Sequence, residues 1–177
     1  MRVAFGSDHG GAEFKRELLG RAATLAPDLE LIDLGGDGSD AGDDYPDFSL
    51  RVGRAVADGR ADRGVIICGS GVGAAIAATK IRGIRASVCH DTYTARQGVE
   101  HDDMNVLCMG ARVIGIELAV ECLRAFLGAR FSTDARHRRR VAKVLAIESS
   151  GGQIDEQQLA REAARMPGAP APTEGVR

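Results

Sequence analysis

Tryptophan is absent from this chain of 177 residues, and aromatic residues make up 4% of it. Proteins that hold single-stranded nucleic acid stack its bases on aromatic side chains, so this scarcity argues against such a platform. The formal net charge is −2, unlike the basic balance of an electrostatic nucleic-acid binder. Every apolar run falls short of the ~18 residues of a membrane-spanning helix. We therefore expect no nucleic-acid partner and no membrane partner.

The four cysteines, at positions 68, 89, 108 and 122, form no CxxC pair, and no Cys/His group has the spacing of a zinc site. Each lies in or beside an apolar stretch, as buried thiols in a reducing compartment do. The first residues already have the pattern of a strand rather than of a signal peptide. We expect a cytoplasmic protein without bound metal or disulfides.

Short apolar strands alternate with amphipathic helices along most of the chain. The expected strands are at 2–6, 29–34, 65–68, 85–89 and 105–109. The expected helices are at 14–25, 48–56, 74–80, 92–100, 116–127 and 136–148. This alternation predicts right-handed crossovers and an α/β fold, with one parallel sheet covered by helices on both faces. On the last of these helices, we expect Val141, Val144 and Leu145 to face inward.

The end of the chain differs in composition from the rest. Residues 149–152 read as a linker, 153–165 have the pattern of one polar helix, and 167–177 are rich in Pro, Ala and Gly, as disordered segments are. We therefore predict one domain over 1–148, followed by a polar linker, a short helix and a disordered tail over 149–177.

Polar and glycine-rich residues follow several predicted strands, where open α/β sheets bind their ligands. The most informative stretch is 68–73 (CGSGVG), whose glycines let the backbone approach a ligand and present N–H groups to an anion or an oxyanion. Cys68 lies directly before these glycines and is either a buried strand-end residue or a thiolate base at the mouth of a pocket. A loose G-x-G-x-x-A pattern from Gly69 to Ala74 also leaves dinucleotide binding open, although that fingerprint normally follows the first strand.

A basic run at 136–140 (RHRRR) places Arg136 and Arg140 on one helix face, a spacing that suits a phosphate group. A solvated helix face and a weak nucleic-acid patch are the alternatives. His9 and His101 lie in turn-like polar segments, where a histidine can carry a proton near neutral pH. The aspartates at 37, 40, 43, 44 and 47 lack the spacing of an EF-hand and its closing Glu, so we interpret them as turn formers.

Together these pieces resemble the type B ribose-5-phosphate isomerases and the related galactose-6-phosphate isomerase subunits. The stretches that carry the resemblance are 6–11 (GSDHGG), 44–47 (DYPD), 67–73 (ICGSGVG), 83–86 (GIRA), 105–107 (NVL), 110–115 (GARVIG) and 136–140 (RHRRR). They occur in the family's order and spacing, and the match as a whole extends from residue 2 to about 148. The resemblance implies a three-layer α/β/α sandwich with a Rossmann-like five-stranded parallel sheet. It also implies a homodimer or tetramer with active sites between subunits.

The resemblance further implies cofactor-free isomerisation of a phosphorylated sugar through a cis-enediolate. Cys68 moves the proton, Ser70 and the backbone of Gly69, Gly71 and Gly73 stabilise the enediolate, and His101 assists ring opening. By the same resemblance, Asp8 and Tyr45 are expected to contact the sugar. His9, Arg112, Arg136 and Arg140 are expected to hold the phosphate, with His101 and Arg112 supplied by the partner subunit. Some relatives use a Glu base, and the resemblance of this chain is to the Cys type.

One position departs from the family pattern. Ribose-phosphate members commonly read His-Asn-Asp-x-Asn, and this chain has Asp102 in place of the first Asn. An ionised carboxylate can only accept hydrogen bonds, whereas an amide can also donate. Ribose 5-phosphate is the leading substrate, and a tetrose phosphate such as erythrulose 4-phosphate or a hexose 6-phosphate is the alternative. Asp102 belongs to the predicted substrate site.

Overall fold

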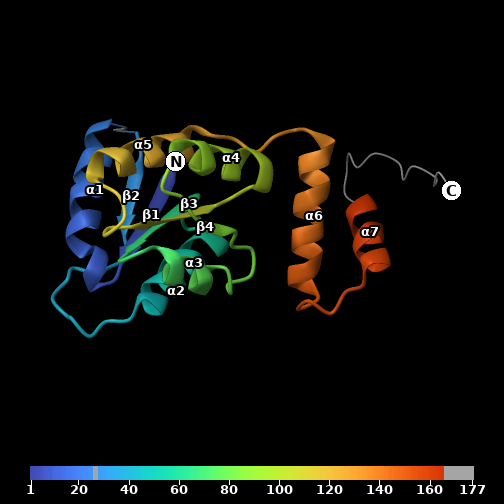
Figure 1. Cartoon of the computed structure of the whole chain (residues 1–177), viewed down its shortest axis with the longest axis horizontal. Helices are drawn as coiled ribbons and strands as arrows, with labels where there is room; N and C mark the ends of the chain where they lie inside the picture. The colour runs from blue at the N-terminus through green and yellow to red at the C-terminus, as the bar shows by residue number, and fades with distance from the viewer. Residues whose placement is uncertain (26–27, 166–177) are drawn as a thin grey trace.

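The computed structural model describes residues 1–25 and 28–165, in which strands and helices alternate (Figure 1). The strands are β1 (Arg2–Ser7), β2 (Glu30–Asp33), β3 (Arg63–Cys68), β4 (Ala86–Val88) and β5 (Val106–Gly110). The helices are α1 (Ala12–Leu25), α2 (Tyr45–Ala57), α3 (Val72–Ala78), α4 (Thr92–Asp102), α5 (Ile116–Gly128), α6 (Ala135–Ser149) and α7 (Glu156–Ala164), and the 3₁₀ turn η1 (His9–Gly11) precedes α1.

The five strands form one sheet in the order β2-β1-β3-β5-β4, and every neighbouring pair is parallel. The predicted α/β class with a five-stranded parallel sheet is therefore confirmed. The chain leaves β1 toward one edge of the sheet and leaves β3 toward the other. The boundary between β1 and β3 is thus the topological switch point, outside which open α/β sheets form their ligand crevice.

Two separate apolar layers hold the helices to the sheet. On one face, side chains from α1, α4 and α5 surround buried strand residues such as Phe5 and Leu107. On the other face, α2 and α3 pack small residues against Ile66 and Cys108. The strands β1, β3 and β5 are buried on both sides, which explains why they read in the sequence as continuous apolar runs.

Helix α6 stands apart from the sandwich, and α7 lies beside it (Figure 1). Val141 faces inward as predicted and Leu145 is half-buried, but the prediction that Val144 faces inward is wrong, because 51% of it is exposed. The helical spacing of Val144 marks an apolar face of α6 correctly, but within this chain Val144 and Ile147 on that face remain exposed. Within the described residues, no helix is long and apolar enough to cross a membrane.

Candidate active site

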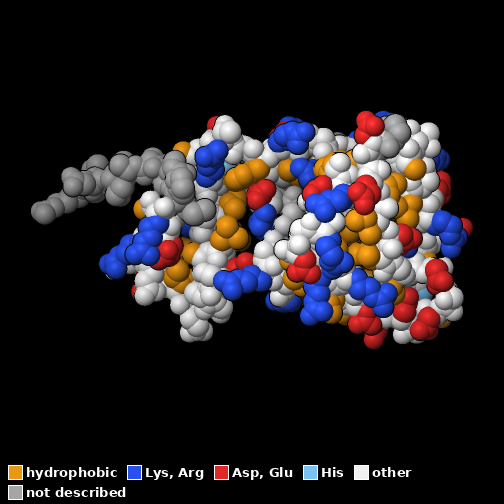
Figure 2. Space-filling model, turned by 180° about the vertical axis from the view of Figure 1, so that it is seen from behind, with side chains coloured by type: hydrophobic (Ala, Val, Ile, Leu, Met, Phe, Trp, Pro, Cys, Tyr) orange, Lys and Arg blue, Asp and Glu red, His pale blue; other side chains and the backbone are white. Residues whose placement is uncertain are grey.

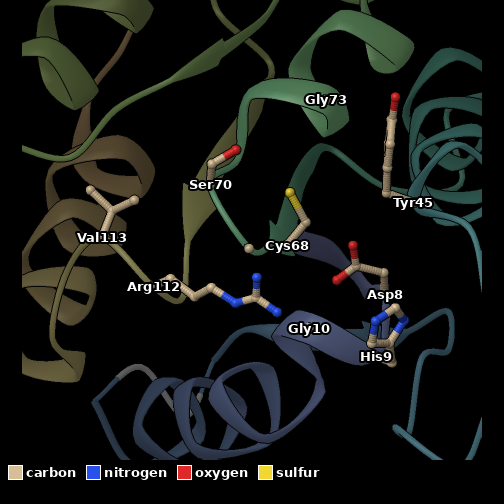
Figure 3. Close-up of a pocket in the computed structure, with 10 residues that line it drawn as sticks. Asp8, His9, Gly10, Tyr45, Cys68, Ser70, Gly73, Arg112 and Val113 are labelled. Atoms are coloured by element: carbon tan, nitrogen blue, oxygen red, sulfur yellow. The ribbon is translucent and has the colours of Figure 1, made fainter. Parts of the chain in front are cut away.

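The loops that follow β1 and β3 face each other at the switch point and line a pocket of about 410 Å³. Figure 3 shows Cys68 and Ser70 on one side of the pocket, Asp8 and His9 on another, and Arg112 reaching in from the end of β5. The lining residues are Asp8, His9, Gly10, Tyr45, Cys68, Gly69, Ser70, Gly73, Arg112 and Val113. Eight of the thirteen predicted site residues are therefore brought together in one chain.

The glycine loop is shaped by tight backbone contacts. Gly71 has φ +82°, a left-handed conformation that favours glycine, and it begins α3. Its N–H donates to Cys68 Sγ at 3.1 Å, which holds the sulfur within the loop at the pocket wall. The end of β5 supports the loop from below, since a Cβ added to Gly110 would lie 2.7 Å from the Ser70 carbonyl carbon. Gly71 itself faces this support rather than the pocket.

Cys68 is the cysteine that lines the pocket, and the remaining three serve the core. Burial raises the pKa of the Cys89 and Cys108 thiols, and it raises the pKa of Cys122 to about 11. A thiol with a raised pKa stays protonated near neutral pH and is a poor base. This agrees with the interpretation of Cys89 and Cys108 as core residues.

Asp8 brings a carboxylate oxygen into the pocket without a partner. Its Oδ1 is buried and has no hydrogen-bond partner among the described residues. Burial and then the nearby Asp43 carboxylate raise the pKa of Asp8, while His9 opposes them. A buried polar atom without a partner is costly. A substrate hydroxyl that donates to this oxygen would remove that cost.

His9 is held by Asp43, although the spacing of this aspartate predicts only a turn former. Asp43 Oδ1 accepts from the His9 backbone N–H at 2.8 Å and lies 2.7 Å from His9 Nδ1. The hydrogen bond that the ring donates to this carboxylate raises the pKa of His9, which favours the cationic ring. Asp37 and Asp40 form the turns expected of them, by accepting from the N–H groups of Ser39 and Gly42.

Arg112 lines the pocket of its own chain, which corrects the expectation that the partner subunit supplies it. Its backbone N–H donates to the Gly69 carbonyl at 3.0 Å, so the residue is tied to the glycine loop. A Cβ on Gly69 would lie 3.7 Å from the Arg112 guanidinium carbon. Within the described part of the chain, no carboxylate forms an ion pair with this guanidinium, which is therefore open to an anion.

Tyr45 lines the pocket on the side away from Arg112 (Figure 3). Its ring lies against α3 so closely that a Cβ added to Gly73 would stand 2.7 Å from Tyr45 Cζ. The glycine at position 73 thus makes room for the ring, and the partly exposed tyrosine keeps its hydroxyl at the pocket rim (Figure 3). Gly10 and Val113 also line the pocket. Both lie inside stretches that carry the resemblance, 6–11 and 110–115, but neither has a side chain with a chemical signal of its own.

Four predicted site residues lie elsewhere, at the junction of α4 and α6. His101 and Asp102 belong to the last turn of α4, which corrects the expectation of a turn, and Arg136 and Arg140 lie on α6. Asp102 instead lines a hollow of about 710 Å³ between α4, β4 and α6. Figure 2 shows hydrophobic side chains beside the hollow between α6 and the body. One chain thus carries its predicted site in two separate groups.

The described residues contain no group of three or more His, Cys, Asp or Glu placed to hold a metal ion. The pocket offers a thiol, two hydroxyls, glycine backbone, a carboxylate, a guanidinium and an imidazole whose pKa is raised. This set suits proton abstraction next to a carbonyl in an anionic substrate.

Residues 3–144 match the ribose/galactose isomerase family. The chain belongs to this family. It is an aldose–ketose isomerase of the sugar-phosphate class. The ribose-5-phosphate isomerase B of Escherichia coli is 44% identical over 147 residues, which cover 83% of this chain and 96% of that protein.

A curated relative and a solved structure are similar to this chain over most of their length. The D-erythrulose-4-phosphate isomerase 2 of Mycolicibacterium smegmatis is 36% identical over 152 residues, covering 85% of this chain and 99% of that protein. The ribose-5-phosphate isomerase B structure from Clostridium thermocellum superposes with a TM-score of 0.79 at 44% identity, covering 85% of this chain and 99% of that one. Because the chain belongs to an isomerase family, we interpret the glycines at 69–74 as part of the isomerase pocket rather than as a dinucleotide-binding pattern.

Proposed function

We propose that this isomerase interconverts ribose 5-phosphate and ribulose 5-phosphate through a cis-enediolate, with Cys68 as the base and without a cofactor. The observation that carries the proposal is the placement of Cys68 in the glycine loop, in one pocket with Ser70, Asp8, His9 and Arg112. Similarity to two proteins named ribose-5-phosphate isomerase B, at 44% identity each, supports this substrate.

In the forward direction, the Cys68 thiolate takes the proton from C2 of the open-chain aldose. The electron pair of that C–H bond forms the C1–C2 double bond, and the carbonyl electrons move onto O1. The Ser70 hydroxyl and the loop N–H groups of Gly69 and Gly73 stabilise the resulting oxyanion, while the Gly71 N–H holds the Cys68 sulfur. The O2 hydroxyl proton then passes to O1, the electron pair on O2 re-forms a carbonyl at C2, and the electrons of the C1–C2 double bond take the proton from the Cys68 thiol onto C1, which gives the ketose and regenerates the thiolate.

The rest of the pocket holds the sugar phosphate. The unpartnered Asp8 oxygen accepts from a sugar hydroxyl, and the Tyr45 hydroxyl binds another. His9, with its pKa raised by Asp43, and the unpaired Arg112 bind the phosphate, since charge-assisted hydrogen bonds to phosphate are strong. Binding far from the reacting carbons anchors a small flexible substrate and supplies energy for the reaction at C1 and C2.

The two separate groups of site residues support a homodimer with composite sites. His101, Arg136 and Arg140 lie at the α4–α6 junction, away from the pocket of their own chain. Helix α6 projects from the sandwich and leaves Val144 and Ile147 exposed beside the edge strand β4. In the proposed dimer, a second copy covers these apolar side chains, and each α4–α6 junction completes the pocket of the other subunit.

Asp102 and the erythrulose-phosphate relative support a second candidate, a tetrose phosphate. Asp102 is exposed directly after His101, so it would enter the partner's pocket with that histidine. A carboxylate there accepts from a sugar hydroxyl but repels a nearby phosphate or enediolate. Asp102→Asn is expected to raise kcat/KM for ribose 5-phosphate relative to erythrose 4-phosphate. An unchanged ratio would show that Asp102 does not contact the sugar.

The experiment that tests the function compares kcat/KM for four-, five- and six-carbon sugar phosphates on the purified protein. Ribose 5-phosphate is expected to give the highest value. A higher value for erythrose 4-phosphate or for a hexose 6-phosphate would replace the proposed substrate while keeping the reaction class.

A further inference from the structure

Two histidine rings join the last turn of α4 to the first turn of α6. The rings of His101 and His137 stack with their centroids 4.0 Å apart and their planes 24° apart. The backbone is tied at the same place, because the N–H of Ser132, just before α6, donates to the Glu100 carbonyl at 2.9 Å. The α4–α6 junction is therefore a defined contact, although α6 stands apart from the rest of the sandwich.

The stack fixes the orientation of His101. Gln97, one turn earlier on α4, places its Nε2 atom 2.7 Å from His101 Nδ1. His137 covers one face of the same ring, and only 3% of His137 is exposed. With one nitrogen and one face of the ring engaged, His101 Nε2 is the nitrogen that remains to act on a substrate.

His137 is suited to lie beside a ring that gains and loses a proton. Burial lowers its pKa, and the neighbouring His101, Arg136 and Arg140 lower it further, while Asp134 alone opposes them. The ring of His137 therefore remains neutral near pH 7 and adds no positive charge against His101. The Nδ1 atom of His137 is buried without a hydrogen-bond partner among the described residues. The ring of His137 therefore contacts His101 by stacking.

We propose that His137 is a positioning residue for His101. It holds the ring of His101 at one orientation and fixes it relative to Arg136 and Arg140, so that the group that opens the sugar ring and the groups that bind the phosphate enter the partner's pocket as one unit. This inference rests on the proposed function, in which His101 assists ring opening.

The chemistry of ring opening supplies a selective test. In cyclic ribose 5-phosphate, the bond between C1 and O4 breaks, O4 gains a proton and the hydroxyl on C1 loses one, which gives the open-chain aldehyde. Erythrose 4-phosphate carries its phosphate on O4 and cannot close this five-membered ring. A defect confined to ring opening therefore slows the first substrate and spares the second, whereas a disordered α6 weakens both through the phosphate contacts.

The experiment measures kcat/KM for both sugars in the intact protein and in the variants His101→Ala, His137→Ala and His137→Phe. His137→Ala is expected to lower kcat/KM for ribose 5-phosphate by roughly 10- to 100-fold, the scale of a misplaced reacting group. Its value for erythrose 4-phosphate is expected to change by less than about threefold. His137→Phe, which keeps a flat ring, is expected to recover most of the loss. Arg138→Ala, an exposed neighbour on α6, is the control.

The outcomes separate this inference from the proposed function. If His101→Ala is selective and His137→Ala is not, the positioning role is wrong while the role of His101 stands. If His101→Ala itself slows both sugars equally, ring opening by His101 fails, and the positioning role fails with it. If the intact protein does not turn over erythrose 4-phosphate, proton exchange into C1 of acyclic ribulose 5-phosphate in D₂O replaces that measurement.

Discussion

Asp43 binds His9 twice, at the backbone N–H and at the ring nitrogen Nδ1, with distances of 2.8 Å and 2.7 Å to the same carboxylate oxygen. The second contact orients the ring and raises its pKa. The carboxylate reaches His9 because the loop after β2 is clamped over the end of β1. Buried Lys15 binds Asp33 and the Gly35 carbonyl, and Gly36 packs against the Ser7 backbone.

Asp43→Asn is expected to shift the pH dependence of phosphate binding. The raised pKa extends the cationic form of His9 to higher pH, so affinity for phosphate is lost as the pH rises through this raised value. Without the carboxylate, the pKa of His9 falls, and the loss of affinity moves to lower pH. Titration of inorganic phosphate between pH 6 and 9 measures the shift. Asp40→Asn, in the same loop, is the control, and identical profiles for both variants would exclude this role of Asp43.

Cys68→Ala is expected to reduce isomerisation by roughly 100-fold or more, the usual scale for general acid–base catalysis, without loss of the fold. Cys89→Ala, which removes a buried thiol away from the pocket, is expected to keep near-normal turnover. Steady-state rates and circular dichroism of both variants check this. Near-normal turnover of Cys68→Ala would remove the thiol from the mechanism.

Arg136→Ala and Arg140→Ala are each expected to weaken binding of inorganic phosphate by about 10-fold or more, because each removes a charged hydrogen bond. Substitutions of Arg138 and Arg139, on other faces of α6, are expected to matter much less. Calorimetry on the four variants distinguishes the two pairs. Equal losses in all four would indicate a diffuse charged surface rather than a phosphate site.

Alanine substitutions at Gly110 and Gly20 are expected to change the free energy of unfolding in opposite directions. A Cβ at Gly110 would lie 2.7 Å from the Ser70 backbone, so Gly110→Ala is expected to destabilise the fold by ~1–3 kcal/mol and to lower activity. Gly20 lies on the exposed side of α1 with nothing within 4 Å of its Cβ position. Gly20→Ala is expected to stabilise the protein by about 1 kcal/mol, since alanine favours a helix. Urea unfolding of both variants measures the difference.

The sheet and the pocket could be predicted because their signals are local. Buried parallel strands appear as apolar runs bounded by glycine, and the residues after β1 and β3 meet wherever these strands are neighbours. Contacts that depend on tertiary packing left no such signal. Asp43 resembles its fellow turn aspartates until the loop folds back onto His9. Arg112 could not be assigned to a subunit from its position in the sequence, and Val144 has the spacing of a core residue although the chain leaves it exposed.

Complementation between two inactive variants tests the composite site most directly. Cys68→Ala and His101→Ala chains carrying different tags are co-expressed, and the mixed dimer is purified through both tags. If each pocket takes His101 from the other subunit, the mixed dimer has one complete site, formed by Cys68 of the His101→Ala chain and His101 of the Cys68→Ala chain. The mixed dimer should then recover about half of the native isomerase activity. If Cys68 and His101 act within one chain, neither site is complete, and activity no higher than that of the single-variant dimers would contradict the composite site.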